Sequence, residues 1–70
     1  MTAVEIRIKL QRTLELSEVE GLSRLSTVYG IRRMRADGQE LLIEFDATRM
    51  NEAEVLALVR GAGLPAESAG

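Results

Sequence analysis

The side chains that could carry out chemistry in this 70-residue chain are few. The sequence contains no cysteine and no histidine, which excludes thiolate metal sites and a cysteine nucleophile and removes the commonest general base. A serine or threonine nucleophile would therefore lack its usual base. The carboxylates of Glu52 and Glu54 are neighbours at the end of a predicted helix rather than partners across a cleft. We expect a protein that is not an enzyme.

Carboxylates and thioethers are the remaining groups that could bind a metal. Glu15, Glu18 and Glu20 cluster around a predicted helix start, where the partial positive charge of the helix N-terminus favours acidic side chains in any protein. The only sulfur atoms belong to Met1, Met34 and Met50. Met34 and Met50 are assigned below to packing, and methionine fills space more often than it binds metal. We expect no metal site and no cofactor.

Four cations are predicted to share one sheet face, and they raise the question of nucleic-acid binding. They are Arg7, Lys9, Arg33 and Arg35. Sheets that bind single-stranded RNA stack bases on exposed aromatic side chains, but aromatic residues make up only 3% of this chain. The net charge of −2 and the interspersed glutamates favour a solvated face with cross-strand ion pairs. We expect no nucleic-acid partner.

Length and composition indicate one small domain. The chain has 46% hydrophobic residues, which suits a globular protein, and 70 residues leave no room for a second core. We predict a single domain over residues 1–70, with its core at about 3–65 and a flexible tail at 66–70. No apolar run approaches the roughly 18 residues that cross a bilayer, and the N-terminus does not look like a signal peptide. We therefore expect no membrane insertion and a cytoplasmic location.

The first two elements are predicted from hydrophobic spacing. Apolar residues alternate with charged ones from Val4 to Leu10, which is typical of a half-buried strand. Ser17 and Glu20 have the spacing of a capping box, so a helix should begin just after Ser17. Its apolar stripe would consist of Val19, Leu22, Leu25 and Val28.

A hairpin is predicted around Asp37-Gly38, because this dipeptide favours a two-residue turn between strands. A loop of these two residues places Ala36 opposite Gln39 and Met34 opposite Leu41. The predicted inward set is Met34, Leu41, Ile43 and Phe45. The predicted open-face set is Arg33, Arg35, Glu40, Leu42 and Glu44.

A second helix is predicted to begin after Asn51, which forms a capping box with Glu54. Gly61 and Gly63 should end it, and Pro65 prevents its continuation. The element order is strand, helix, strand, strand, helix, with a last strand that is weak or absent. This order predicts an α+β, ferredoxin-like βαββα(β) sandwich with an antiparallel sheet and two helices on one of its faces.

At this point the chain resembles the heavy-metal-associated domain, the fold of small copper chaperones. The similar segments are Gly30-Ile31, the run from Glu44 through Phe45-Asp46 to Val55, and Ala62-Gly63-Leu64. The resemblance covers about Val4 to Leu64 and implies the same ferredoxin-like fold. It also implies that partner domains dock at the loop between the first strand and the first helix.

The sequence departs from that family where the family binds its metal. The family motif M-x-C-x-x-C falls on residues 12–17, and Leu14 and Ser17 stand at the two cysteine positions. Neither side chain is a soft ligand, and Cu(I) requires thiolate, thioether or imidazole. The resemblance therefore implies the fold without thiol metal binding.

Three functions remain open from the sequence. The leading hypothesis is a non-catalytic protein-interaction or accessory module, with candidate contact residues Arg12, Leu14, Leu16 and Leu42. A second is metal handling, through weak binding or docking to a metal transporter, and a third is a small regulatory ligand-binding module. The weak last strand would also leave the edge of the first strand open, which predicts a homodimer through that edge.

Overall fold

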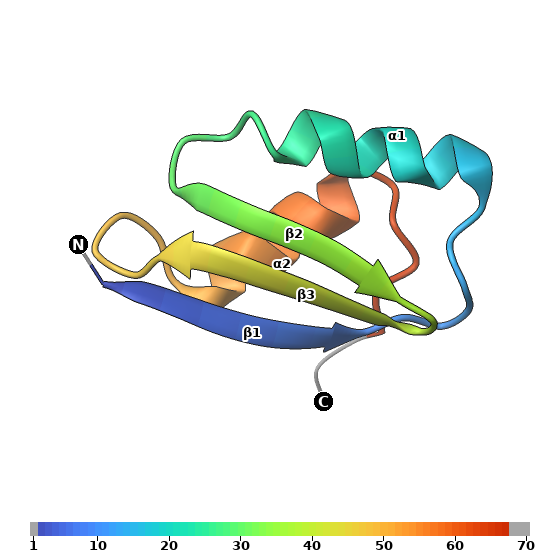
Figure 1. Ribbon diagram of the computed structural model, residues 1–70, viewed down its shortest axis with the longest axis horizontal. Helices are drawn as coiled ribbons and strands as arrows, with labels where there is room; N and C mark the ends of the chain where they lie inside the picture. The colour runs from blue at the N-terminus through green and yellow to red at the C-terminus, as the bar shows by residue number, and fades with distance from the viewer. Residues whose placement is uncertain (1, 68–70) are drawn as a thin grey trace.

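The protein is a small α+β fold, seen in a computed structural model that describes residues 2–67. Its elements are β1 (Ala3–Lys9), α1 (Leu16–Leu25), β2 (Ile31–Asp37), β3 (Glu40–Asp46) and α2 (Glu52–Gly61). The strands form an antiparallel sheet in the order β1-β3-β2, so β3 is central (Figure 1). The predicted order of the five elements is confirmed.

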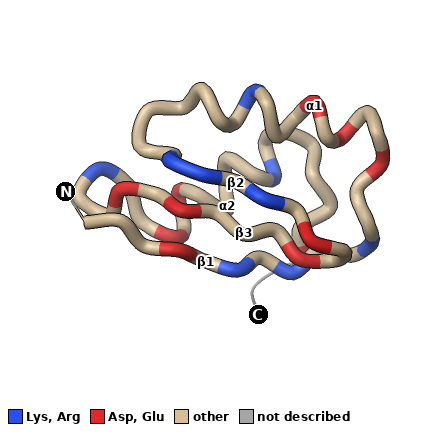
Figure 2. Tube along the Cα trace, viewed as in Figure 1, with Lys and Arg blue, Asp and Glu red and all other residues tan. Residues whose placement is uncertain are grey.

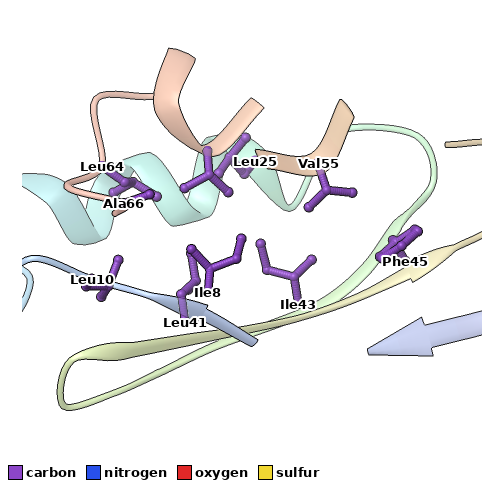
Figure 3. Packing of buried hydrophobic residues seen from close by; sticks show 10 residues of the cluster. Ile8, Leu10, Leu25, Leu41, Ile43, Phe45, Val55, Leu64 and Ala66 are labelled. Atoms are coloured by element: carbon purple, nitrogen blue, oxygen red, sulfur yellow. The ribbon is translucent and has the colours of Figure 1, made fainter. Parts of the chain in front are cut away.

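One hydrophobic core lies between the sheet and the two helices. Figure 3 shows side chains of β1 and β3 directed toward side chains of α1, α2 and the segment after α2. The largest fully buried side chains are Phe45, Leu10, Leu41, Ile43, Val55 and Val59. Both helices therefore pack on the same face of the sheet, and the other face has no covering element among the described residues.

The pairing of β1 with β3 follows the predicted alternation. Val4 lies opposite Phe45, Ile6 opposite Ile43 and Ile8 opposite Leu41. These pairs all point toward the helices, because alternate residues of a strand face the same side. The intervening charged residues of β1 are exposed.

The hairpin turn lies one residue later than the sequence predicts. Asp37 pairs with Glu40, so the loop is Gly38-Gln39 rather than Asp37-Gly38. Gly38 has φ +60, whereas Gln39 is not among the residues with positive φ in the described part of the chain, which is the pattern of a type II′ turn with glycine first. Met34 consequently lies opposite Ile43 instead of Leu41. Each partner moves by two residues, so the predicted inward and open-face sets are unchanged.

The predicted start of the first helix is wrong. Helix α1 begins at Leu16 with Glu15 at the N-cap, so Ser17 lies inside the first turn and does not cap it. The side chain that closes this turn is Glu18, whose carboxylate accepts a hydrogen bond from the backbone N–H of Glu15 at 2.8 Å. Val19, assigned to the core stripe, is 44% exposed.

Gly21 explains how α1 is oriented. It is buried, and a Cβ atom built there would lie 3.3 Å from the carbonyl oxygen of Ala62 and 3.5 Å from Leu64. The missing side chain therefore lets α1 approach the segment that follows α2. This contact turns Gly21 and Leu25 toward the core and leaves Val19 at the surface.

Both ends of α2 match the sequence signals. The backbone N–H of Glu54 donates to Asn51 Oδ1 at 2.9 Å, and the N–H of Asn51 donates to Glu54 Oε1 at 3.2 Å. At the C-terminus Gly63 has φ +83, and the N–H of Leu64 donates to the carbonyl of Val59. This is the glycine-dependent end that places Leu64 against the core.

Within residues 62–67, the segment after α2 pairs with the chain at the end of β1 through one isolated bridge. Leu10 and Ala66 form an isolated antiparallel bridge, with hydrogen bonds from Gln11 N–H to Pro65 O and from Glu67 N–H to Lys9 O. Ala66 is 9% exposed, so the packed region extends one residue beyond the predicted core boundary. Residues 68–70 of the predicted flexible tail lie outside the described part of the chain.

Candidate interaction surfaces

The loop before α1 is held by an ion pair of matched geometry. Arg12 Nη1 lies 2.6 Å from Glu18 Oε1, and Arg12 Nη2 lies 2.8 Å from Glu18 Oε2. Such a two-pronged contact fixes the orientation of both planar groups. The Arg12 hydrogen bonds, together with the N–H of Glu15, hold the pKa of the Glu18 carboxyl below its usual range. The loop is therefore tied to the first turn of α1.

Two leucines of this region lie in different environments. Leu14 is half-buried and packs against the core, whereas Leu16 is 86% exposed at the first residue of α1. Val19 lies one helical turn further on and is also exposed. We name Leu16 and Val19, together with the loop over residues 11–15, the α1-start surface. It presents apolar side chains to solvent from a backbone that Glu18 holds in place.

The positions that match the family cysteines lie at this same surface. Leu14 is in the loop, and Ser17 is exposed in the first turn of α1. Neither supplies a soft metal ligand. Within residues 2–67, no three side chains of aspartate, glutamate, cysteine or histidine are grouped so that they could hold a metal ion.

Leu42 is not available as an exposed contact. It lies on the open face of the sheet, opposite Arg7 on one side and Arg35 on the other, and is only 8% exposed. Long arginine side chains cover neighbouring apolar surface with their hydrocarbon stems while their charged ends stay in water. Leu42, a candidate contact residue from the sequence, is therefore buried on the open face between Arg7 and Arg35.

Ion pairs run across the open face. Arg7 Nε lies 3.0 Å from Glu40 Oε2, and Arg32 Nε lies 3.4 Å from Glu44 Oε1. Positive and negative residues are interspersed over the three strands (Figure 2). This face is a mixed-charge surface rather than a continuous positive patch.

Sequence reasoning missed a groove between the two helices. It has a volume of about 770 Å³ and is lined mainly by small and apolar residues, with Arg24 and Glu54 as its charged groups. Its lining includes Val28, Met50, Ala57, Leu58, Gly61 and Ala62. The sequence feature that could have indicated this groove is the pair of small, exposed residues Ala57 and Gly61 on α2, because they leave space that larger side chains would fill.

The corner after β3 is built around a buried carboxylate. Asp46 is 6% exposed, and its Oδ1 atom accepts hydrogen bonds from the Thr48 hydroxyl at 2.6 Å and the Thr48 N–H at 3.0 Å. These bonds, with smaller contributions from Thr2 and Arg49, hold the pKa of Asp46 below its usual range despite its burial. Arg49 also lies 4.2 Å from the ring centre of the exposed Tyr29. Because these groups satisfy one another, the corner is structural.

Comparisons with known proteins returned no match: no family model matches the chain, and no curated protein or solved structure is significantly similar to it. None of the helices within residues 2–67 is long and apolar enough to cross a membrane.

Proposed function

We propose that this chain is a non-catalytic protein-interaction module and that it contacts its partner through the α1-start surface. The observation that carries the proposal is the 86% exposure of Leu16 on a helix start that the Arg12–Glu18 ion pair fixes. Burying one leucine side chain contributes about 1.5–3 kcal/mol. Little of this free energy is offset by the entropy cost of ordering the loop on binding, because the Arg12–Glu18 ion pair already holds the loop in place.

The arrangement of the elements supports a ferredoxin-like relationship. In that fold the first strand lies between the third strand and the last one. Here β1 pairs with β3, and within residues 2–67 the pairing on the other side of β1 is limited to the bridge from Leu10 to Ala66 and its two flanking hydrogen bonds. We interpret this bridge as the remnant of a fourth strand in a fold that resembles the heavy-metal-associated domain.

The same resemblance favours the α1-start surface as the docking region. In that family, partner domains dock at the loop between the first strand and the first helix. In this chain the loop keeps the family's length, but Leu14 and Ser17 replace the metal-binding cysteines. An apolar contact through Leu16 then takes the place of a metal-dependent one.

Photocrosslinking in cells tests the proposal. A photoreactive amino acid in place of Leu16 should crosslink one dominant partner protein, and the same label in place of Thr27, exposed beyond the other end of α1, should not. Adding Val19→Asp to the chain labelled at position 16 should remove the crosslink, because it places a charge in the apolar contact. Crosslinking from position 16 no stronger than from position 27 would contradict the proposal.

A further inference from the structure

The outer edge of β1 carries backbone groups that nothing in residues 2–67 pairs. The N–H of Leu10 donates to Gln39 O, and the carbonyl of Thr2 accepts from Ala47, so the even-numbered residues direct their backbone groups toward β3. The odd-numbered residues must direct theirs outward, because these directions alternate along an antiparallel strand. Lys9 confirms this, since its carbonyl accepts from Glu67 on the outer side.

Within residues 2–67, the part of this edge without a partner runs from Ala3 to Ile8. Pairing by the described C-terminal residues, up to Glu67, is limited to the bridge between Leu10 and Ala66 and its two flanking hydrogen bonds. The outward N–H and C=O groups of Glu5 and Arg7 have no hydrogen bond within the described residues. A row of such groups is a template for another strand.

A groove with both apolar and charged lining residues lies beside the β1 edge. It has a volume of about 340 Å³ and is lined by Ile6, Ile8 and Leu56, with charged residues around them. Ile6 and Leu56 are only half-buried. A strand added to β1 would direct alternate side chains into this groove.

The other edge of the sheet is protected. The outer strand there is β2, which carries Arg32, Arg33 and Arg35 within seven residues and has a register irregularity between Ile31 and Arg33. Clustered like charges and bulges are the usual ways in which proteins block pairing at an edge. From Ala3 to Lys9 the β1 edge has no register irregularity, and its charges are of mixed sign, Glu5 with Arg7 and Lys9, so they can pair across an antiparallel two-fold axis.

We propose that the β1 edge pairs with the β1 edge of a second copy, antiparallel about a two-fold axis at Ile6. In this register Glu5 lies opposite the partner's Arg7, and the two residues exchange their backbone hydrogen bonds. The two-fold axis generates a second such pair, Arg7 opposite the partner's Glu5. It also places Val4 opposite the partner's Ile8. A six-stranded sheet results, and the apolar side chains Val4, Ile6 and Ile8 meet on its helix-covered face.

The charges on β1 favour a two-fold axis at Ile6 over an axis at Glu5 or Arg7. An axis at Glu5 places two glutamates opposite each other, and an axis at Arg7 places two arginines opposite each other. Both arrangements are unfavourable for directly facing residues. Glu5 also faces Glu44 within its own sheet and has no ion pair among the described residues, so the partner's Arg7 supplies the opposite charge that it lacks.

The interface is short, so the dimer is a reversible one. Hydrogen bonding of Glu67 to Lys9 stops the pairing near Ile8, which leaves about 17 Å of strand at the usual rise per residue. Short interfaces give weak complexes, and we expect a dissociation constant between about 1 µM and 1 mM. This edge is separate from the α1-start surface, so the two proposals fail independently.

Sedimentation equilibrium with charge-reversal variants tests the register. The full chain should dimerise between about 10 µM and 1 mM, and Glu5→Arg or Arg7→Glu alone should weaken dimerisation at least tenfold. An equimolar mixture of the two variants should recover a heterodimer, because every facing pair is then again of opposite charge. Glu20→Arg and Arg24→Glu make the same changes in net charge on α1, away from both edges of the sheet, and should leave dimerisation unchanged.

Four results would overturn the proposal. One is a monomer at 1 mM, and another is a dimer that neither Glu5→Arg nor Arg7→Glu weakens. The third is a failure of the mixture to associate while each variant keeps the wild-type circular dichroism and urea midpoint. A dimer abolished by Leu16→Asp instead would place self-association at the α1-start surface and also contradict the β1 register.

Discussion

Glu18 accepts a hydrogen bond from the backbone N–H of Glu15 at 2.8 Å while it also binds Arg12. One carboxylate thus closes the first turn of α1 and fixes the loop that leads into it. A capping serine could satisfy only the helix end. The geometry of the α1-start surface therefore depends on the Glu18 carboxylate, although its exposed apolar residues are Leu16 and Val19.

This relationship predicts unequal effects of two neighbouring substitutions. Ser17→Ala should change the free energy of unfolding by less than about 0.5 kcal/mol, because Ser17 is an exposed residue without a capping role. Glu18→Ala should lower the urea midpoint clearly and speed hydrogen exchange of the Glu15 amide. Equal urea midpoints for the two variants would show that the turn is held in another way.

The cap of α2 should respond as an ordinary N-cap. Asn51→Ala removes the oxygen that accepts from the Glu54 N–H and should cost about 1 kcal/mol, within the usual range of roughly 0.5–2. Asn51→Asp keeps an acceptor there and should remain close to the wild type. Urea denaturation of the three proteins measures the difference, and an alanine variant as stable as the aspartate variant would contradict the assigned cap.

The two helix starts show what sequence patterns can and cannot predict. Asn51 and Glu54 form a purely local motif, so their spacing was sufficient. Ser17 and Glu20 have a similar spacing, but Glu18 is drawn to Arg12, which lies six residues away and outside the helix. Helix α1 begins at Leu16 instead, where the Arg12 contact accompanies a capping box formed by Glu15 and Glu18. The capping-box pattern considers only residues at the helix start, so it does not include a partner such as Arg12 from the preceding loop.

The candidate contact residues show the same limit. The pattern placed Leu42 on the open face, but its 8% exposure depends on the cross-strand neighbours Arg7 and Arg35. Leu14 and Leu16 are both loop-region leucines in the sequence, and the structure turns one toward the core and the other outward. Their orientation follows from where α1 begins. The interhelical groove depends on the packing of two distant segments, which no local pattern encodes.

Asp46 should make stability depend on acid pH. Its hydrogen bonds to Thr48 lower its pKa in the folded state below the ordinary value of 3.8. A carboxyl with a depressed folded-state pKa contributes stability that is fully present above the unfolded value and is lost as the pH falls through the folded value. We therefore expect the Asp46 contribution to be complete above about pH 4 and to disappear below it.

Thr48→Val provides the specific check on Asp46. The variant removes the hydroxyl that donates at 2.6 Å but keeps the backbone N–H, so the pKa of Asp46 should move up toward its ordinary value. NMR titration of the Asp46 carboxyl measures this pKa directly. Asp46→Asn should lower stability at neutral pH and flatten its decline in acid. An unchanged titration curve in Thr48→Val would contradict the assigned cause.

The resemblance to the heavy-metal-associated domain makes a prediction about Cu(I). The wild-type chain has no thiol, so it should bind Cu(I) no more tightly than other proteins without thiols. Leu14→Cys combined with Ser17→Cys should create a site for one Cu(I), because both positions lie at the start of α1 with the family's spacing. The first turn of a helix also favours the thiolate form that binds the metal.

Competition with a Cu(I) chelator, read by native mass spectrometry, measures this difference. The double variant should retain one Cu(I) per chain, whereas the wild type and the single variant Ser17→Cys should lose it to the chelator. Substituting the two residues keeps Glu18 and therefore keeps the contact that fixes the loop. A double variant that folds with wild-type circular dichroism but loses its Cu(I) would show that the loop does not have the family's geometry. Retention of Cu(I) by the wild type would instead reveal a methionine or backbone site.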